Sequence, residues 1–280
     1  MFVTKFLDPK NDFAFKKIFG SEKNKDILIQ FLNDILGFTE REKIRNVSFL
    51  KTAQDPDIAA KKQSIVDVLC IDETGVQYIV EMQIAHHDGF EKRAQYYAAK
   101  AYTSQLNNGA AYENLKEIIF LAITGFVMFP DKPGYKSDHV ILDRGSYAHD
   151  LKDFSFTFLE LPKFHKTIDE LSNMVEKWMY FFKHAPHTDL EELEKITGDD
   201  IVIRKAYEAL SEISWSEEEL RTYDRERKSQ LDMQAMLSAS RKEGIAEGRI
   251  QIAKNMRLQG FDIQTVVSVT GLSREQVLTI

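Results

Sequence analysis

Three polar side chains interrupt two apolar segments near the first third of the chain. Asp67 lies within residues 65–71, which are otherwise apolar, and Glu81 and Gln83 lie within residues 76–83. Carboxylates in apolar surroundings are costly unless they are protonated, paired with a cation or bound to a metal ion. Because neither segment contains Lys or Arg, the sequence favours a bound metal ion.

Oxygen ligands of this kind suit Mg²⁺ or Mn²⁺. These cations keep several bound waters and take one or two carboxylates together with a substrate phosphate. Activation of a water molecule for attack on a phosphodiester is the natural reaction of such a site. The residue types therefore predict metal-dependent phosphodiester hydrolysis centred on Asp67 and Glu81.

The two segments form a predicted β-hairpin. Residues 73–75 (Glu-Thr-Gly) carry a tight-turn signal between them. A turn centred on Thr74 places Asp67 opposite Glu81 on the neighbouring strand. Directly opposed residues have Cβ atoms about 4.5–5.5 Å apart, and like charges at that distance are destabilising. The hairpin therefore adds a second reason to expect a cation between the two carboxylates.

The rest of the pattern predicts a mixed α/β sheet covered by helices and followed by a helical region. Helices are expected at residues 12–19, 27–36 and 91–106, the last of which closes near residues 107–109. The region after Pro162 is expected to be helical throughout, with one long polar helix over 215–241. Strands are expected at 47–50, 117–123, 140–142 and 155–161, and a loop or strand edge is expected at 54–63. We divide the chain into a core at 1–165, a helical region at 166–243 and a small helical tail at 244–280, which begins where Gly244 and Gly248 interrupt the helical pattern.

The tail contains a segment similar to half of a helix-turn-helix. In residues 261–280, Gly271 lies at the turn and Ser273 opens the last helix. Such a unit can read DNA. Its few positive charges, chiefly Arg274, make a packing or dimer-forming role an equal alternative.

Composition is that of a folded globular protein and limits its setting. Of the 280 residues, 43% are hydrophobic and 29% are charged. The single cysteine, Cys70, predicts a reducing cytoplasm, and no signal peptide or membrane-spanning segment is expected. The net charge of -7 permits nucleic-acid binding without arguing for it, because the acidic excess is concentrated in residues 150–220.

Other motifs point to no competing chemistry. The chain has neither a G-x-x-x-x-G-K-[ST] phosphate loop nor a G-x-G-x-x-G motif, which disfavours nucleotide-dependent reactions. His86, His87 and Asp88 have no partner at a metal-ligand spacing, so we interpret them as a loop.

Several motifs together resemble a known family. Asp67 followed on the next strand by Glu81 and Gln83 is similar to the D…(D/E)xK signature of PD-(D/E)XK nucleases, with Gln83 where that superfamily usually has Lys. More narrowly, the chain resembles the Rpn family of recombination-promoting nucleases or transposases. The segments that carry this resemblance are Asp12-Phe13-Ala14-Phe15-Lys16, Val80-Glu81-Met82-Gln83, Arg93 with Tyr97, and Glu247-Gly248-Arg249 with Thr270-Gly271-Leu272-Ser273.

The resemblance implies a PD-(D/E)XK, restriction-endonuclease-like fold and a Mg²⁺-dependent DNA endonuclease linked to recombination, transposition or other mobile-element biology. It implies that Asp67 and Glu81 are metal ligands and that Gln83 orients the attacking water or a phosphate oxygen. Because Gln cannot supply the charge of Lys, Gln83 lowers the expected rate or leaves that work to another side chain.

Further roles and readings stay open. Asp12 is an additional acidic candidate, or a helix N-terminal charge favoured by the dipole, and Arg93 and Tyr97 are candidates for phosphate contact or ordinary surface and core residues. A homodimer is compatible with cutting both strands of DNA. The alternatives are a catalytically degenerate nuclease fold that binds DNA or a protein, and a helical scaffold in which both acids are incidental.

Overall fold

The computed structural model describes residues 6–51, 53–54, 64–106, 111–198 and 200–280. Most of the expected loop at residues 54–63 and the expected helix end at 107–109 lie outside these ranges. The chain forms two compact units, Met1–Asp224 and Arg225–Ile280, which are described separately below.

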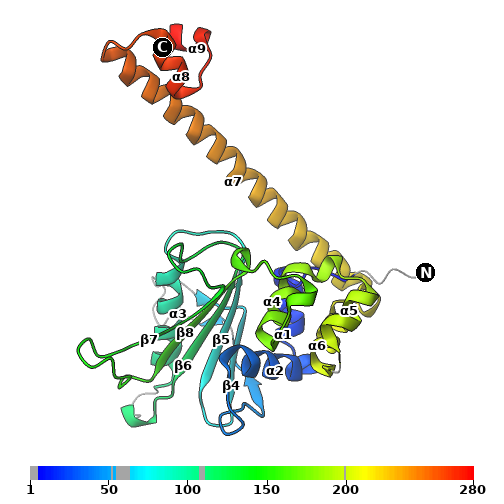
Figure 1. Ribbon diagram of the computed structural model, residues 1–280. Helices are drawn as coiled ribbons and strands as arrows, with labels where there is room; N and C mark the ends of the chain where they lie inside the picture. The colour runs from blue at the N-terminus through cyan, green and yellow to red at the C-terminus, as the bar shows by residue number, and fades with distance from the viewer. Residues whose placement is uncertain (1–5, 52, 55–63, 107–110, 199) are drawn as a thin grey trace. The chain divides into compact units, whose positions relative to one another are not determined.

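The first unit is built on a six-stranded mixed sheet in the order β1-β4-β5-β6-β8-β7 (Figure 1). Its strands are β1 (Val47–Phe49), β4 (Val68–Asp72), β5 (Gln77–Gln83), β6 (Ile118–Thr124), β7 (Lys136–Val140) and β8 (Phe154–Glu160), and the short strands β2 (Ala53–Gln54) and β3 (Ser64–Ile65) pair separately. Strands β5, β6 and β8 run parallel, and the other pairs are antiparallel. The predicted mixed sheet is confirmed, although the strand expected at residues 140–142 lies earlier in the chain, as β7.

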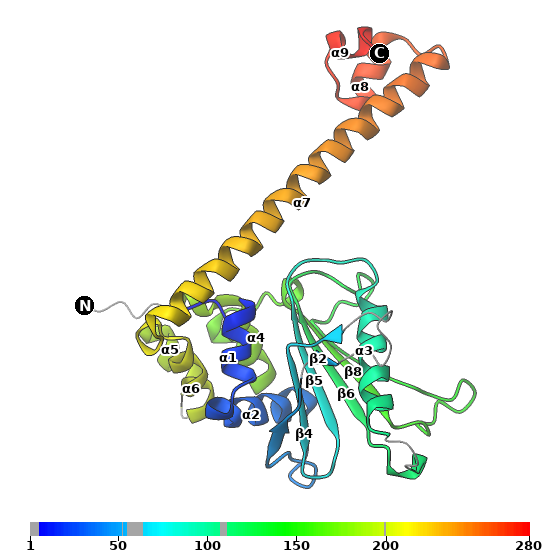
Figure 2. The same cartoon turned by 180° about the vertical axis from the view of Figure 1, so that it is seen from behind.

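Helices cover both faces of this sheet (Figures 1 and 2). The helices of the first unit are α1 (Asp12–Phe19), α2 (Lys25–Leu36), α3 (Phe90–Ser104), α4 (Met174–His184), α5 (Leu190–Thr197) and α6 (Ile201–Leu210). Helix α3 packs on one face against Leu69, Ile79 and Phe120. The other face packs against α1, α2, α4 and α6 through a core rich in aromatic rings, including Phe31 and Trp178. The sheet is therefore buried between two helical layers.

The β4–β5 hairpin has the predicted register. The pairs run from Ile71 opposite Gln77 to Val68 opposite Val80. Gly75 closes the turn at φ 94°, a backbone conformation that favours glycine. The ladder ends at Val68, so Asp67 lies one residue beyond the paired strand.

The helices that follow β8 belong to the same core as the first two helices. Buried residues of α4 and α6 join those of α1 and α2 in one cluster, and the first unit therefore extends to Asp224. The division into functional regions at 165 and 243 stays a prediction, and neither position coincides with the end of this unit.

Helix α7 (Glu217–Leu258) is longer than the sequence pattern indicated. The interruption expected at Gly244 and Gly248 is wrong, because the helix continues through both. An exposed glycine within a helix costs only about 1 kcal/mol relative to Ala, and flanking helix-forming residues offset that cost.

The second unit ends in a small helical core. Ala253 of α7 packs with Val266 of α8 (Ile263–Thr270) and with Val277 of α9 (Arg274–Leu278). Gly271, at φ 68°, makes the turn between α8 and α9, as expected from the sequence. Nowhere in the described ranges does a helix combine the length and apolar character that crossing a bilayer requires.

One buried carboxylate fastens α4 to the segments around it. Glu176 accepts hydrogen bonds from Tyr135 (3.1 Å), the Ser172 N–H (2.8 Å), the Ser172 hydroxyl (3.0 Å) and Lys166 (2.5 Å). Burial opposes ionisation, but these donors outweigh it and lower the pKa of Glu176 to about 2. Glu176 is therefore ionised and structural.

We expect Glu176→Gln to lower the free energy of unfolding by about 2 kcal/mol, because a neutral amide loses the ion pair and places an NH₂ group among donors. Urea denaturation at pH 7 measures this change. Glu191→Gln is the matched control, since Glu191 is 82% exposed and contacts Lys195 at 3.1 Å on the surface. Equal stability of the two variants would contradict the structural role of Glu176.

Candidate active site

Side chains with predicted roles meet where β5 ends and β4 begins, between α1 and α3. They are Asp12 on α1, Asp67 before β4, Glu81 and Gln83 on β5, and Arg93 and Tyr97 on α3. The strands fix the two acids, and each helix brings groups from one face of the sheet.

Asp67 lies at a break in the strand alternation. Val66 and Leu69 both pack on the α3 face, whereas a regular strand would place residues three positions apart on opposite faces. At this break the Asp67 side chain turns across to β5, where its Oδ2 accepts a hydrogen bond from the Met82 N–H at 2.9 Å. Asp67 can therefore contact a group from α1 as well as one from β5.

The Asp67 carboxylate is mostly buried and is not fully neutralised. Its side chain is 14% exposed, and its Oδ1 lies 3.4 Å from the Lys16 ammonium. Burial raises the pKa of Asp67, while the hydrogen bond from Met82 and the charge of Lys16 lower it and Asp12 raises it. The net direction is upward, to about 6, so burial makes the charged form of Asp67 less favourable than in water, and a nearby cation would stabilise it.

Glu81 is the less satisfied of the two acids. It is 5% exposed, and its Oε1 has no hydrogen-bond partner among the described residues. Burial and the neighbouring charge of Asp67 raise the pKa of Glu81, and the charge of Arg93 opposes them. A buried carboxylate oxygen without a donor is costly, and a cation would remove that cost.

Lys16 also belongs to this site, although the sequence pattern predicts no role for it. Its ammonium lies 2.8 Å from Asp12 one helical turn earlier and 3.4 Å from Asp67. The Asn11 side chain caps α1 by accepting from the Ala14 N–H, which fixes the start of the helix. The spacing of Asp12 and Lys16 was visible in the sequence, but the approach of α1 to Asp67 depends on tertiary packing.

Gln83 and Arg93 form a second polar pair beside the acids. Arg93 donates to the Gln83 Oε1, and the Gln83 Nε2 donates to the Ala85 carbonyl at 2.9 Å. The Arg93 guanidinium carbon also lies 4.8 Å from the centre of the Phe90 ring and 5.9 Å from that of Tyr97. Gln83 is thus held by hydrogen bonds on both sides of its amide.

A close backbone approach shapes the edge of the site. The Gly125 N–H donates to the Gln83 carbonyl at 2.9 Å, just after β6. A Cβ at Gly125 would lie 2.9 Å from the Ile84 carbonyl oxygen, which is shorter than real contacts allow. Glycine at this position lets the chain leave β5 directly beside the end of β6.

The donor set fits a hard divalent cation. Asp67 and Glu81 offer only oxygens, and Glu81 has one buried oxygen without a donor. In the part of the chain that the structure describes, no group of three or more His, Cys, Asp or Glu side chains is arranged to hold a metal ion. Two carboxylates would therefore supply part of a coordination shell, as is common for Mg²⁺, which keeps waters and takes substrate phosphate.

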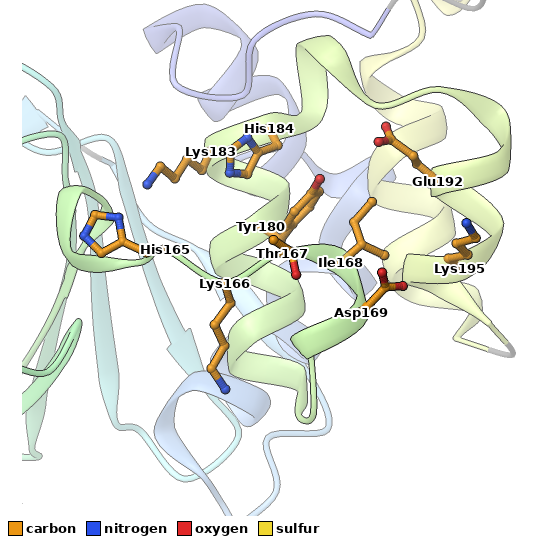
Figure 3. Close-up of a pocket in the computed structure, with 10 residues that line it drawn as sticks. All are labelled: His165, Lys166, Thr167, Ile168, Asp169, Tyr180, Lys183, His184, Glu192 and Lys195. Atoms are coloured by element: carbon orange, nitrogen blue, oxygen red, sulfur yellow. The ribbon is translucent and has the colours of Figure 1, made fainter.

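Two further features of the first unit do not include these acids: the histidine segment after β5 and a pocket beside α4. His86 packs against Phe126 and is 3.8 Å from the exposed Asp88, which agrees with the loop interpretation. A separate pocket of about 510 Å³ lies against α4 and α5 (Figure 3). It is lined by His165, Lys166, Thr167, Ile168, Asp169, Tyr180, Lys183, His184, Glu192 and Lys195, none of which has a role predicted from the sequence.

A comparison with known families agrees with this arrangement of strands and acids. The model of a protein family described as PD-(D/E)XK nuclease family transposase matches residues 9–240 of the chain. The chain belongs to this family. The match covers the whole sheet, both helical layers and most of α7, so the PD-(D/E)XK fold expected from the sequence is confirmed.

Membership of the PD-(D/E)XK family bears on the kind of ion and substrate that the paired acids could bind. Nucleases of this family generally use divalent metal ions and act on DNA. No match was found among curated proteins or among solved structures. The roles of individual residues in this PD-(D/E)XK chain therefore rest on its own geometry.

Proposed function

We propose that this PD-(D/E)XK chain is a metal-dependent DNA endonuclease that hydrolyses phosphodiester bonds. The observation that carries the proposal is the buried Asp67–Glu81 pair, in which both carboxyl pKa values are raised and one Glu81 oxygen has no donor. Such a pair is unfavourable as a purely structural feature. It suits a protein that binds a cation to function.

Asp67 and Glu81 are the proposed metal ligands, with Mg²⁺ as the expected ion and Mn²⁺ as a substitute. When bound, the cation would polarise the scissile phosphate and lower the pKa of the attacking water. The Met82 N–H holds Asp67 in place, which fixes one ligand before substrate arrives. Asp12 contributes indirectly by fixing Lys16 and adding negative charge beside Asp67.

Gln83, Arg93 and Tyr97 are proposed to bind the DNA strand around the reacting phosphate. The Gln83 amide orients the water or a phosphate oxygen, and Arg93 supports that amide from α3. In the reaction, the water oxygen forms a bond to phosphorus as the bond from phosphorus to the leaving sugar oxygen breaks. The water gives up a proton to solvent, and the sugar oxygen takes one.

A plasmid assay tests the proposal. Purified full-length protein incubated with supercoiled plasmid should produce nicked or linear DNA with Mg²⁺ or Mn²⁺ and none with EDTA. Absence of cleavage under all metal conditions would favour the alternative, a degenerate nuclease fold that binds DNA or a protein. DNA retention measured by gel shift would then separate those two binding roles.

Gln83→Lys is expected to retain metal-dependent cleavage. Lysine is the commoner residue of the superfamily signature, and its ammonium can reach a phosphate from the same strand position. The cost is repulsion from Arg93, which now donates to Gln83. Plasmid cleavage by the variant measures the outcome. Complete loss of cleavage in a folded, metal-binding variant would mean that Gln83 has a role that Lys cannot fill.

The biological setting is proposed more broadly. We propose a role in recombination, transposition or other mobile-element biology, in keeping with the transposase family to which the chain belongs. A cytoplasmic setting is in keeping with Cys70, a free cysteine buried in the sheet. A homodimer would bring two active sites to one duplex.

A further inference from the structure

The position that usually carries a catalytic lysine in this superfamily signature holds a neutral residue here. The Gln83 amide is also committed, since its oxygen accepts from Arg93 and its nitrogen donates to the Ala85 carbonyl. Gln83 can orient a ligand but cannot offset the negative charge that develops on a phosphate during hydrolysis. If the site cleaves DNA, another group has to supply that charge.

Among the described residues, two positively charged side chains, Arg93 and Lys16, act on the Asp67–Glu81 pair. They differ in how firmly their positions are held. Arg93 is held by Gln83 and lies over the Phe90 ring. Its position is fixed by α3 and suits binding of a strand. The Lys16 side chain is 39% exposed, and its ammonium lies 2.8 Å from Asp12 and 3.4 Å from Asp67. Its flexible stem lets the ammonium move between carboxylates and an incoming phosphate.

Packing directs Lys16 toward the site. The opposite side of α1 is anchored by Phe15 and Ile18, which are fully buried in the core. The neighbouring Lys17 points elsewhere, with its ammonium 2.6 Å from Glu219 and 4.1 Å from the centre of the Trp215 ring. Of these two adjacent lysines, Lys16 therefore faces Asp67 and Lys17 faces Glu219.

We infer that Lys16, delivered from α1, is the catalytic cation that replaces the missing lysine of the β5 signature and contacts the scissile phosphate. This inference rests on the proposed nuclease function. Before substrate binds, Lys16 partly neutralises Asp67. With a cation bound by Asp67 and Glu81, the Lys16 ammonium would be free to move from Asp67 to the phosphate, and it keeps its protons throughout.

The charge state of Lys16 agrees with this role. Burial favours the neutral amine, but the hydrogen bond and charge of Asp12 and the charge of Asp67 outweigh it and raise the pKa of Lys16. The ammonium is therefore charged at neutral pH. Asp12 acts as a positioning residue, since it holds Lys16 one turn away along α1.

Lys16→Met tests the inference in the full-length protein. We expect kcat for Mg²⁺-dependent plasmid cleavage to fall about 100- to 1,000-fold, the size typical of losing one group that stabilises transition-state charge. Mn²⁺ affinity, measured by calorimetry, should be unchanged or tighter, because a cation that competes for Asp67 has been removed. A purely structural lysine would instead leave kcat unchanged and alter only stability.

Relocation of the charge provides a second measurement. The double variant Lys16→Met with Gln83→Lys should cleave at least about tenfold faster than Lys16→Met alone, because the lysine returns to β5. Lys16→Arg should also retain more activity than Lys16→Met, because it keeps the positive charge. Lys17→Met is the matched control, expected to keep the parent kcat because Lys17 contacts Glu219 and Trp215.

These measurements distinguish failure of the Lys16 role from failure of the proposed nuclease function. A parent that cleaves and a Lys16→Met variant that cleaves equally fast would overturn the role of Lys16 while leaving the nuclease function intact. A parent without metal-dependent cleavage would overturn both. If Lys16→Met is unfolded by circular dichroism, Lys16→Arg and Lys16→Gln decide, and equal rates for these two would count against a role for the charge.

Discussion

Asp67→Asn should reduce Mg²⁺-dependent cleavage by at least about a thousandfold, because the amide removes one of two proposed metal ligands and the negative charge that attracts the cation. The amide oxygen can still accept from the Met82 N–H, so the fold should be preserved. Plasmid cleavage at saturating DNA measures the loss. Asp88→Asn is the control, since the Asp88 side chain is fully exposed and lies 3.8 Å from His86.

The same variant separates a functional acid from a structural one. Without metal at pH 8, relief of repulsion toward Glu81 should leave Asp67→Asn as stable as the parent or more stable by about 1 kcal/mol. Saturating Mg²⁺ should raise the Tm of the parent but not that of the variant, because binding stabilises only a protein with an intact site. A variant that is less stable without metal and still gains Tm with Mg²⁺ would show that Asp67 is a structural acid paired with Lys16.

The second large effect is a dependence of metal-free stability on pH. Burial, with the charge of Asp67, raises the pKa of Glu81 to about 8 in the folded protein, whereas an unfolded carboxyl titrates near its ordinary value. Between the ordinary carboxyl pKa and about 8, the folded protein therefore binds more protons at Glu81 than the unfolded chain does. Stability contributed by protonated Glu81 is present below the ordinary carboxyl pKa and is lost as pH rises toward about 8.

Glu81→Gln isolates this contribution from other titrating groups. In EDTA, the parent should lose stability relative to the variant between pH 5 and 8, by up to about 1.4 kcal/mol for each unit of pKa difference. Urea unfolding at several pH values measures the difference, and Mg²⁺ should abolish it at pH 8 in the parent. Parallel pH profiles for the two proteins would show that Glu81 is ionised in the metal-free fold.

Local sequence signals were sufficient for the hairpin and its acids. Alternating apolar residues and Gly75 set the turn and the register, and with them the approach of Asp67 to Glu81. The break at Asp67 was not predicted, because strand periodicity alone does not show where a ladder ends. Lys16 received no role because its contact with Asp67 depends on how α1 packs across the sheet.

For the helical region, the sequence predicted the helices but not how they pack. Apolar periodicity predicted amphipathic helices after Pro162, and these form α4, α5 and α6. It could not predict that they complete the core begun by α1 and α2, since packing partners distant in sequence leave no local pattern. The continuation of α7 through two glycines reflects the small cost of each in an exposed helix.

The way α1 is anchored bears on when, during synthesis, the segment that carries Lys16 can reach its final position. The Asp8 N–H donates to the Tyr223 hydroxyl at 3.0 Å, and the Asn11 side chain donates to the Tyr223 carbonyl at 3.3 Å. These contacts join the segment that leads into Lys16 to a residue translated more than two hundred positions later. A nascent chain that ends before α7 would lack these two hydrogen bonds, and the start of α1 would be held by its packing against the other helices. The contribution of α1 to the surroundings of Asp67 is therefore complete only after Tyr223 has been synthesised.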